Sequence, residues 1–290
     1  FAGYNPEVAT GPDGWSMKDL QQLSHEAWQA LTPILEWAHT RGRWPAVIQR
    51  LRVHLIPKPL GDPAAVHGPG DYRPIQVGSI LHRAWSSVAF AHMLPRLRQI
   101  LHEGQYGGNT RSANAMLATL CATVELEYLT QDPNDPASAP PNATASAAVL
   151  DLHKCFDSLR FTDAVRLMRW ADLPPEIVRA TGGYYGCLPG QHPQTHGTQH
   201  LYQALGGASD WRPRSHGMVQ GCSVSIAALS LMMLRVHQRV QTASPAHALS
   251  FLDDLTLLGR NPDEVETALQ AATETFRVYS ATVQTRKSTR

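Results

Sequence analysis

The chain has 290 residues, of which 43% are hydrophobic and 17% are charged. This composition is typical of a folded protein and excludes the charge-rich, apolar-poor make-up of a disordered chain. The formal net charge of +1 gives no overall basic field, so charge alone neither indicates nor excludes a nucleic-acid partner. The longest apolar stretch, Ile226 to Leu234, is interrupted by Ser230 and is shorter than the roughly 18 residues of a membrane span, so we expect no membrane partner.

The N-terminal part predicts one helix followed by two short strands. Ser16 is expected to cap a helix whose apolar residues share one face as far as Leu35. Residues 52–56 then form a strand ended by a proline, and a Gly/Pro-rich loop over 59–70 leads into a second strand at 72–75. These strands should form a pair joined by a loop with basic residues at its ends.

The rest of the chain alternates helical and strand patterns. In chain order we expect helices over 79–101 and 110–128, an irregular insertion over 131–146, a strand over 147–152, helices over 162–171 and 175–185, a strand over 201–205, a helix over 223–240, a hairpin formed by 249–252 and 255–258, and a helix over 263–279. Strands interleaved with helices indicate an α+β or α/β core.

Acidic residues stand at the ends of two of the expected strands. Asp151 closes an apolar strand, and Asp253 and Asp254 are expected at the tip of a hairpin. Each would be unremarkable alone, because loops and turns favour Asp. Antiparallel strands can nevertheless bring Asp151 and Asp253 side by side, and carboxylate oxygens are the ligands that Mg²⁺ prefers. Two such ions about 4 Å apart would support an in-line phosphoryl displacement of the kind polymerases perform.

Short motifs in a fixed order carry a resemblance to reverse transcriptases, and they run from about Gly11 to Lys287. They are Gly11 to Ser16, Leu55 to Lys58 with Tyr72 to Ile75, Glu103 to Gly107 with Arg111 and Ser112, Asp151 to Asp157, Gly217 to Gly221, and Phe251 to Asp254. The opening motif is similar to that of non-LTR retrotransposon enzymes, and group II intron-like enzymes remain close. So many motifs in this order are not expected by chance.

The resemblance implies an α+β right-hand polymerase fold of fingers and palm, with an antiparallel palm sheet packed on helices. Residues 1–146 would be mainly fingers, with the start of the palm and a loop insertion at 131–146, and residues 147–290 would be palm. No thumb is recognised, so we expect a fragment whose partners include the remaining domains of a parent protein.

The resemblance also implies the metal site. Asp151 and Asp253 would be the principal ligands of two Mg²⁺ ions, for which Mn²⁺ is an alternative, and Asp254 a further acid. The carbonyl oxygen of Leu152 would be an extra ligand. Lys287 would protonate the departing pyrophosphate.

Further residues would contact the incoming nucleotide. Lys58 and Arg73 match family positions that bind the triphosphate, and a Lys point charge and an Arg fork both suit phosphate. Phe156 would exclude a ribose 2′-hydroxyl and so favour deoxynucleotides. Gln220 and Gly221 would line the nucleotide site, where Gly permits close approach of the backbone.

The implied function is that of an RNA-directed DNA polymerase from a retroelement, with an RNA template, a DNA or RNA primer and dNTPs as partners. One alternative is an RNA-dependent RNA polymerase, which uses the same two-metal chemistry. The other is a catalytically inactive nucleic-acid-binding remnant of a retroelement. The sequence leaves the cellular location open, although a nuclear site would suit an element that copies itself into chromosomes.

Overall fold

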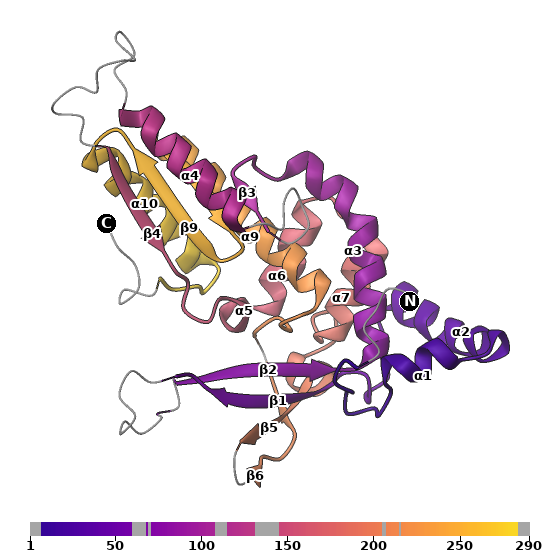
Figure 1. Ribbon diagram of the computed structural model, residues 1–290. Coiled ribbons are helices and arrows are strands. Elements are labelled where there is room, and N and C mark those ends of the chain that lie inside the picture. Colours follow the sequence, from indigo (N-terminus) through magenta and orange to yellow (C-terminus); the bar gives the residue numbers. More distant parts are fainter. Residues whose placement is uncertain are drawn as a thin grey trace. The chain divides into compact units, whose positions relative to one another are not determined.

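The computed structural model describes residues 7–59, 68, 71–107, 115–130, 145–204, 207–214 and 216–283. The chain has a mixed α and β structure and forms two compact units, each with its own sheet (Figure 1). Unit 1 comprises Phe1–Phe90 and Asp172–Val224, and unit 2 comprises Ala91–Ala171 and Ser225–Arg290. None of the described helices is both long and apolar enough to cross a membrane.

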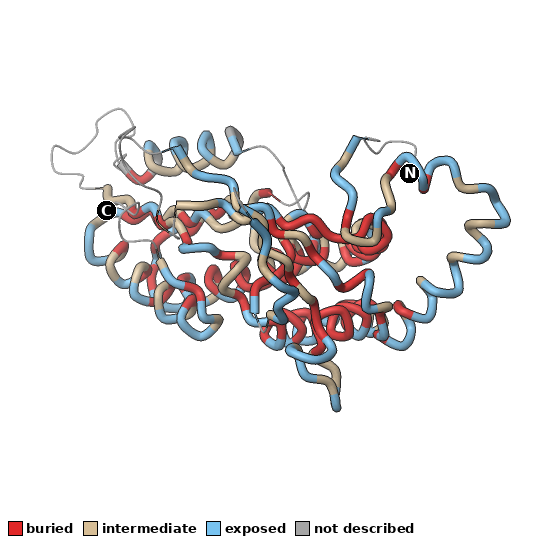
Figure 2. The backbone as a smooth tube through the Cα atoms, turned by 90° about the horizontal axis from the view of Figure 1, so that it is seen from below, coloured by how far each residue is buried: buried red, intermediate tan, exposed pale blue. Residues whose placement is uncertain are grey.

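Unit 1 opens with two helices where the sequence predicted one. Helix α1 (Met17–Gln22) begins at Ser16 as predicted, and Ser16 exchanges hydrogen bonds with Asp19 in a capping box. The prediction of an unbroken helix to Leu35 is wrong, because the extended residue Ser24 caps a second helix, α2 (His25–Arg41). Helix α2 is mostly exposed along its length, and it is the pale blue helix at the right of Figure 2.

The sheet of unit 1 is built on an antiparallel pair, β1 (Arg50–Pro57) and β2 (Tyr72–Gly78), which contain the two strands predicted at 52–56 and 72–75. Strand β5 (Gln199–Ala204) lies parallel to β1 on its other side. The short strands β6 (Gly207–Ala208) and β7 (Arg212–Pro213) both pair with β5. The strand predicted at 201–205 is confirmed within β5, while Leu205 lies outside the described residues.

An aromatic cluster forms part of the core of unit 1. Trp44 donates a hydrogen bond from Nε1 to the carbonyl of Ala180 at 2.8 Å. Its ring makes edge contacts with Trp85 and Tyr184, with ring centroids 5.0 and 5.7 Å apart. Tyr184 in turn stacks on the buried His82 at 3.6 Å. The cluster ties α7 (Pro175–Tyr184) to the first turns of α3 (Ile80–Ile100).

The sheet of unit 2 has the strand order β3-β8-β9-β4 within the described residues. The strands are β3 (Gln105–Tyr106), β8 (His247–Phe251), β9 (Asp254–Gly259) and β4 (Ser146–Leu150). Strands β8 and β9 form the predicted hairpin, and β4 pairs antiparallel with β9. One detail of the prediction is wrong: Leu252 and Asp253 form the tip, and Asp254 is already the first residue of β9.

Helices cover the sheet of unit 2. Helices α4 (Ala115–Thr130) and α10 (Pro262–Val278) both contact it (Figure 1). One sheet face, which includes Leu150 and Leu257, is fully buried, whereas Val149 on the other face is 42% exposed. The remaining helices of the described chain are α5 (Cys155–Ser158), α6 (Phe161–Trp170), α8 (Pro193–His196) and α9 (Ser223–Ala243).

Most of the long predicted helices are confirmed. Helices α3, α6, α7, α9 and α10 correspond to those predicted at 79–101, 162–171, 175–185, 223–240 and 263–279. The strand predicted at 147–152 is shorter and runs from Ser146 to Leu150. Residues 110–114, which were expected to begin a helix, and most of the expected insertion, residues 131–144, lie outside the described residues. Elements β3, α5, α8, β6 and β7 had not been predicted, because each has six or fewer residues, too few to show a period.

Candidate active site

The pairing of β4 with β9 determines where two of the predicted acids lie. Leu150 is the last residue of β4 and pairs with Leu255 of β9. Continuing this register by one residue sets Asp151 opposite Asp254. Because side chains alternate between the faces of a sheet, both acids belong to the same face as the exposed Val149 rather than the buried face of Leu150.

The third acid, Asp253, lies in the turn between β8 and β9. Leu252, which precedes it, has a positive φ of 54°, a conformation that costs a non-glycine residue about 1–2 kcal/mol. The Leu252 N–H donates a hydrogen bond to the Tyr106 carbonyl at 3.2 Å. Strained residues of this kind are often found at functional sites. The turn that carries Asp253 is therefore held by β3 in a specific conformation.

The chain changes its pairing partner directly after Asp151. Leu152 forms an antiparallel bridge with Val283, and the His153 N–H donates to the Thr282 carbonyl at 2.8 Å. Lys154 then adopts a φ of 47° and leads into the short helix α5. Asp151 thus lies at the junction of two pairings, which fixes its backbone on both sides.

Cys155, the first residue of α5, is a buried thiol whose pKa responds to the predicted acids. Burial raises the pKa of its thiol well above the usual value, and the negative charges of Asp253 and Asp151 raise it further. Asp157 and Asp254 act in the same direction. All three sequence-predicted acids therefore act on the charge state of one buried thiol. In the described part of the chain, no three or more His, Cys, Asp or Glu side chains are arranged to hold a metal ion.

The two predicted phosphate-binding cations lie on the β1–β2 pair of unit 1. Arg73 of β2 pairs with Ile56 of β1, and Lys58 stands two residues after Ile56. The Lys58 N–H donates to the Asp71 carbonyl at 2.7 Å, so the pairing continues past the end of the strand. The alternation of side chains therefore assigns Lys58 and Arg73 to the same face. Arg73 is exposed and Lys58 is half-buried.

Gln220 and Gly221 form a turn immediately before α9. Gly221 has a φ of 79° that disfavours any other residue, and a side chain there would meet no neighbour within 4 Å. The preceding Val219 donates its N–H to the hydroxyl of Tyr185 at 3.0 Å, which holds the turn within unit 1. Gly221 is exposed and Gln220 is half-buried.

The sequence-predicted site residues are divided between the two units. Asp151, Leu152, Phe156, Asp253 and Asp254 belong to unit 2, whereas Lys58, Arg73, Gln220 and Gly221 belong to unit 1. Phe156 follows Cys155 on α5 and is half-buried. Lys287 lies outside the described residues.

Sequence reasoning missed two contributors to the site, the thiol of Cys155 and the carbonyl of Tyr106. Both residues lie inside motifs that had been recognised. The place of Tyr106 depends on the long-range pairing of β3 with β8, which no local pattern indicates.

Carboxylates gathered beside a hairpin turn are typical of enzymes that transfer phosphoryl groups with the help of divalent metal ions. The family model described as reverse transcriptase (RNA-dependent DNA polymerase) matches residues 56–290, which is more than half of the chain. The chain therefore belongs to the reverse transcriptase family, whose members are nucleotidyltransferases that use divalent metal ions, a nucleic-acid template and primer, and nucleotides. The chain has no match among curated proteins.

Proposed function

We propose that this chain catalyses RNA-directed DNA synthesis at Asp151, Asp253 and Asp254. The observation that carries the proposal is the register of β4 and β9, which sets Asp151 opposite Asp254 and next to the turn that holds Asp253. Membership of the reverse transcriptase family supplies the reaction class.

The donor set fits Mg²⁺. Carboxylate oxygens are hard ligands, and Mg²⁺ is usually held by one or two carboxylates together with substrate phosphates and water, not by a complete protein cage. The three acids, with the Leu152 carbonyl as a further ligand, would hold two Mg²⁺ ions, and Mn²⁺ would fit the same oxygens. When bound, such ions activate the attacking hydroxyl and stabilise the leaving oxygen.

Lys58 and Arg73 are proposed to bind the triphosphate of the incoming nucleotide. Their position on one face of the β1–β2 pair would allow both to reach a single phosphate chain. The guanidinium of Arg73 would bind two phosphate oxygens at once, and the ammonium of Lys58 would add a point charge.

The remaining roles follow the resemblance. Phe156 would exclude the ribose 2′-hydroxyl, Gln220 and Gly221 would line the nucleotide site, and Lys287 would protonate pyrophosphate. Unit 2 would hold the palm sheet and unit 1 the fingers, and the division into 1–146 and 147–290 stays a prediction. An origin in a non-LTR or group II intron-like retroelement also stays a prediction.

Primer extension on an RNA template with Mg²⁺ and dNTPs tests the proposal. We compare the chain with Asp253→Asn and with Asp263→Asn, an exposed residue of α10 that serves as a matched charge control. Extension by the chain and by Asp263→Asn, but not by Asp253→Asn, is expected. Equal extension by all three proteins would exclude Asp253 from the reaction.

A second readout does not depend on turnover. Mg²⁺ should raise the melting temperature of the chain and of Asp263→Asn, and Asp253→Asn should lose most of this shift because a bound ligand stabilises the folded state. A chain that shows neither extension nor a Mg²⁺ response would be the inactive remnant. Extension with ribonucleotides as efficient as with dNTPs would favour the RNA polymerase alternative.

A further inference from the structure

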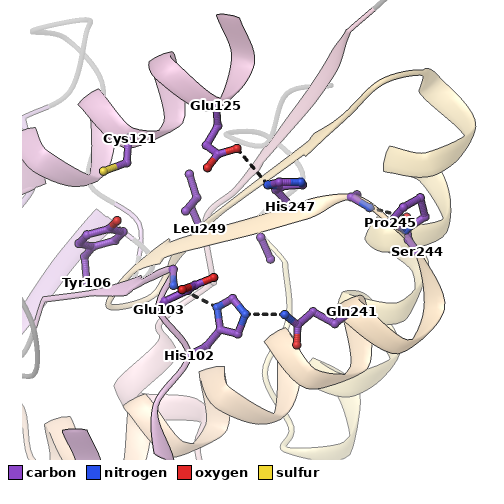
Figure 3. A pocket seen from close by; sticks show the side chains of 13 residues that line it. His102, Glu103, Tyr106, Cys121, Glu125, Gln241, Ser244, Pro245, His247 and Leu249 are labelled. Carbon is purple, nitrogen blue, oxygen red and sulfur yellow. Dashed lines mark hydrogen bonds and ion pairs between the residues drawn. The ribbon is translucent and has the colours of Figure 1, made fainter. Parts of the chain in front are cut away.

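A cavity of about 720 Å³ lies in unit 2, away from the three acids. It is lined by the end of α9, the turn between α3 and β3, one side of α4 and the first residues of β8 (Figure 3). His247 opens β8 at the cavity, whereas the acid-bearing turn follows Phe251 at the other end of the same strand. The lining reaches Leu249 and also Tyr106, whose carbonyl holds the acid-bearing turn, but none of the three acids lines the cavity.

The cavity is lined by negative groups and by no Lys or Arg among its described residues. Glu103 and Glu125 both contribute side chains to it (Figure 3). The last turn of α9 ends at its wall with Gln241 and Ser244, and that turn contains no basic residue. Free carbonyls at a helix C-terminus carry partial negative charge, which favours a cation. Charge complementarity therefore indicates a cationic ligand.

The two acids are available to a ligand in different ways. His247 contacts Oε2 of Glu125 through Nδ1 at 3.0 Å, which orients the carboxylate and leaves Oε1 with no partner among the described residues. Glu103 is exposed and makes no hydrogen bond or ion pair with any described residue. A ligand could thus bind both carboxylates without breaking an existing contact with the described residues.

His102 forms a fixed wall of the cavity and does not compete for the acids. Its Nδ1 accepts a hydrogen bond from the Gly104 N–H at 3.0 Å, and its Nε2 pairs with the side-chain amide of Gln241 at 2.6 Å. The ring also stacks on the buried His237, with centroids 4.7 Å apart. A ring held on both nitrogens and on one face keeps its orientation when a ligand enters.

The size and the surfaces of the cavity point to a guanidinium on a larger molecule. A volume of 720 Å³ falls in the range of about 300–1,000 Å³ that is usual for organic ligands. Tyr106, Pro245 and Leu249 provide an aromatic ring and apolar surface beside the acids (Figure 3). A planar guanidinium can stack on such a ring while it donates paired hydrogen bonds to carboxylates.

We propose that this cavity binds the arginine side chain of a peptide segment, with Glu103 and Glu125 as the acceptors of its guanidinium. The methylene groups of the arginine would lie against Tyr106 and Leu249, and the volume beyond them would hold the flanking residues of the peptide. This site would give the polymerase a protein-binding function that is separate from nucleotide transfer.

Calorimetric titration tests this site on the chain alone, without nucleic acid, metal or nucleotide. The probe is a glycyl-arginyl-glycine peptide with blocked ends, and the same peptide with citrulline in place of arginine removes only the charge. Binding of the arginine peptide is expected to weaken by about tenfold or more in Glu125→Gln and in Glu103→Gln. Glu274→Gln, an exposed residue of α10, should bind as the unchanged chain does.

Free agmatine distinguishes a small guanidinium compound from a peptide. Agmatine bound as tightly as the peptide would overturn the peptide assignment, and citrulline peptide bound as tightly as arginine peptide would overturn charge recognition. Absence of binding to the unchanged chain, or no effect of either Gln variant while circular dichroism shows all proteins folded, would overturn the site. None of these outcomes affects the proposed polymerase activity, because the titration contains no polymerase substrate.

Discussion

The backbone N–H of Leu252 and the carbonyl oxygen of Tyr106 are joined by a hydrogen bond of 3.2 Å. This bond connects the turn that carries Asp253 to β3, which lies parallel to β8. The same turn is packed from the side: a Cβ atom on Gly107 would lie 3.0 Å from Cγ of Leu252. Residues 106 and 107, distant from the acids in sequence, therefore help to fix the position of Asp253.

Substitution of Gly107 by Ala should destabilise the protein and slow primer extension. Gly107 has a φ of 88°, which strains any side chain, and the new methyl group would press on Leu252. Gly190 is a matched control, because it has a φ of 76° and no atom within 4 Å of its added Cβ. Gly190→Ala should lower the free energy of unfolding by about 1 kcal/mol, and Gly107→Ala by about 2–3 kcal/mol.

Urea denaturation and extension rates of both variants provide the measurement. Gly190→Ala is expected to extend primers at the rate of the unchanged chain, since its loss of stability comes only from backbone strain at that position. If the two variants lose equal stability and equal activity, the contact between Gly107 and Leu252 has no part in positioning the turn.

Three buried histidines should make the fold sensitive to acid. Burial lowers the pKa of His82, His200 and His237 from 6.5 to about 3. The unfolded chain therefore binds protons below pH 6.5 that the folded chain does not bind. The stability held by the neutral rings is fully present above pH 6.5 and is lost as the pH falls toward 3, by about 1.4 kcal/mol per pH unit for each histidine.

Urea denaturation at pH 7.5, 6.0 and 5.0 measures this slope. His237→Gln can keep a hydrogen bond to Ser250 in place of the present 2.9 Å contact. This variant should reduce the slope of the free energy of unfolding against pH by about the contribution of one histidine. His92→Gln alters an exposed residue and should leave the slope unchanged. A stability that does not vary between pH 7.5 and 5.0 would show that these rings protonate without unfolding.

The sequence predicted the long elements well because each has a repeating apolar pattern. Helices α9 and α10 and the hairpin of β8 and β9 were recognised in this way. The break between α1 and α2 was missed because apolar spacing continues across it, and the capping oxygen of Ser24 decides the outcome locally. The short strand β3 was missed because two residues show no period.

The candidate acids could be named from the sequence, but their arrangement could not. Strand periodicity indicates that Asp151 ends a strand, yet only the β4–β9 register sets it opposite Asp254. The left-handed conformation of Leu252 has no sequence signal, because leucine rarely adopts it. The burial of Cys155 from solvent likewise depends on tertiary packing.

Asp13 and Arg83 are two imperfectly paired charges inside unit 1. Both carboxylate oxygens of Asp13 and the Nε of Arg83 are buried without a hydrogen-bond partner among the described residues. Burial lowers the pKa of Arg83, and the charge of Asp13 opposes this shift, so each charge makes the burial of the other less costly. Removal of the first charge should therefore lower the free energy of unfolding by more than subsequent removal of the second charge.

A double-mutant cycle measures this coupling by urea denaturation. Arg83→Met should be more destabilising alone than in the Asp13→Asn background, with a coupling free energy of about 1–2 kcal/mol. Additive effects of the two substitutions would show that solvent screens the pair completely.

Phe156 is expected to select the sugar of the incoming nucleotide. It is half-buried on α5, one residue after the thiol whose pKa is raised by Asp151 and Asp253, and the proposed function assigns its ring to the sugar of a nucleotide bound at those acids. Phe156→Ala should raise the kcat/KM for ribonucleotides by about tenfold or more while dNTP use changes less, because removal of the ring opens space for a 2′-hydroxyl. Phe161→Ala would perturb the buried core and is unsuitable as a control, whereas Phe156→Tyr keeps the ring and should keep the discrimination. If Phe156→Ala and the unchanged chain discriminate equally between the two sugars in single-nucleotide extension on RNA, another residue performs the exclusion.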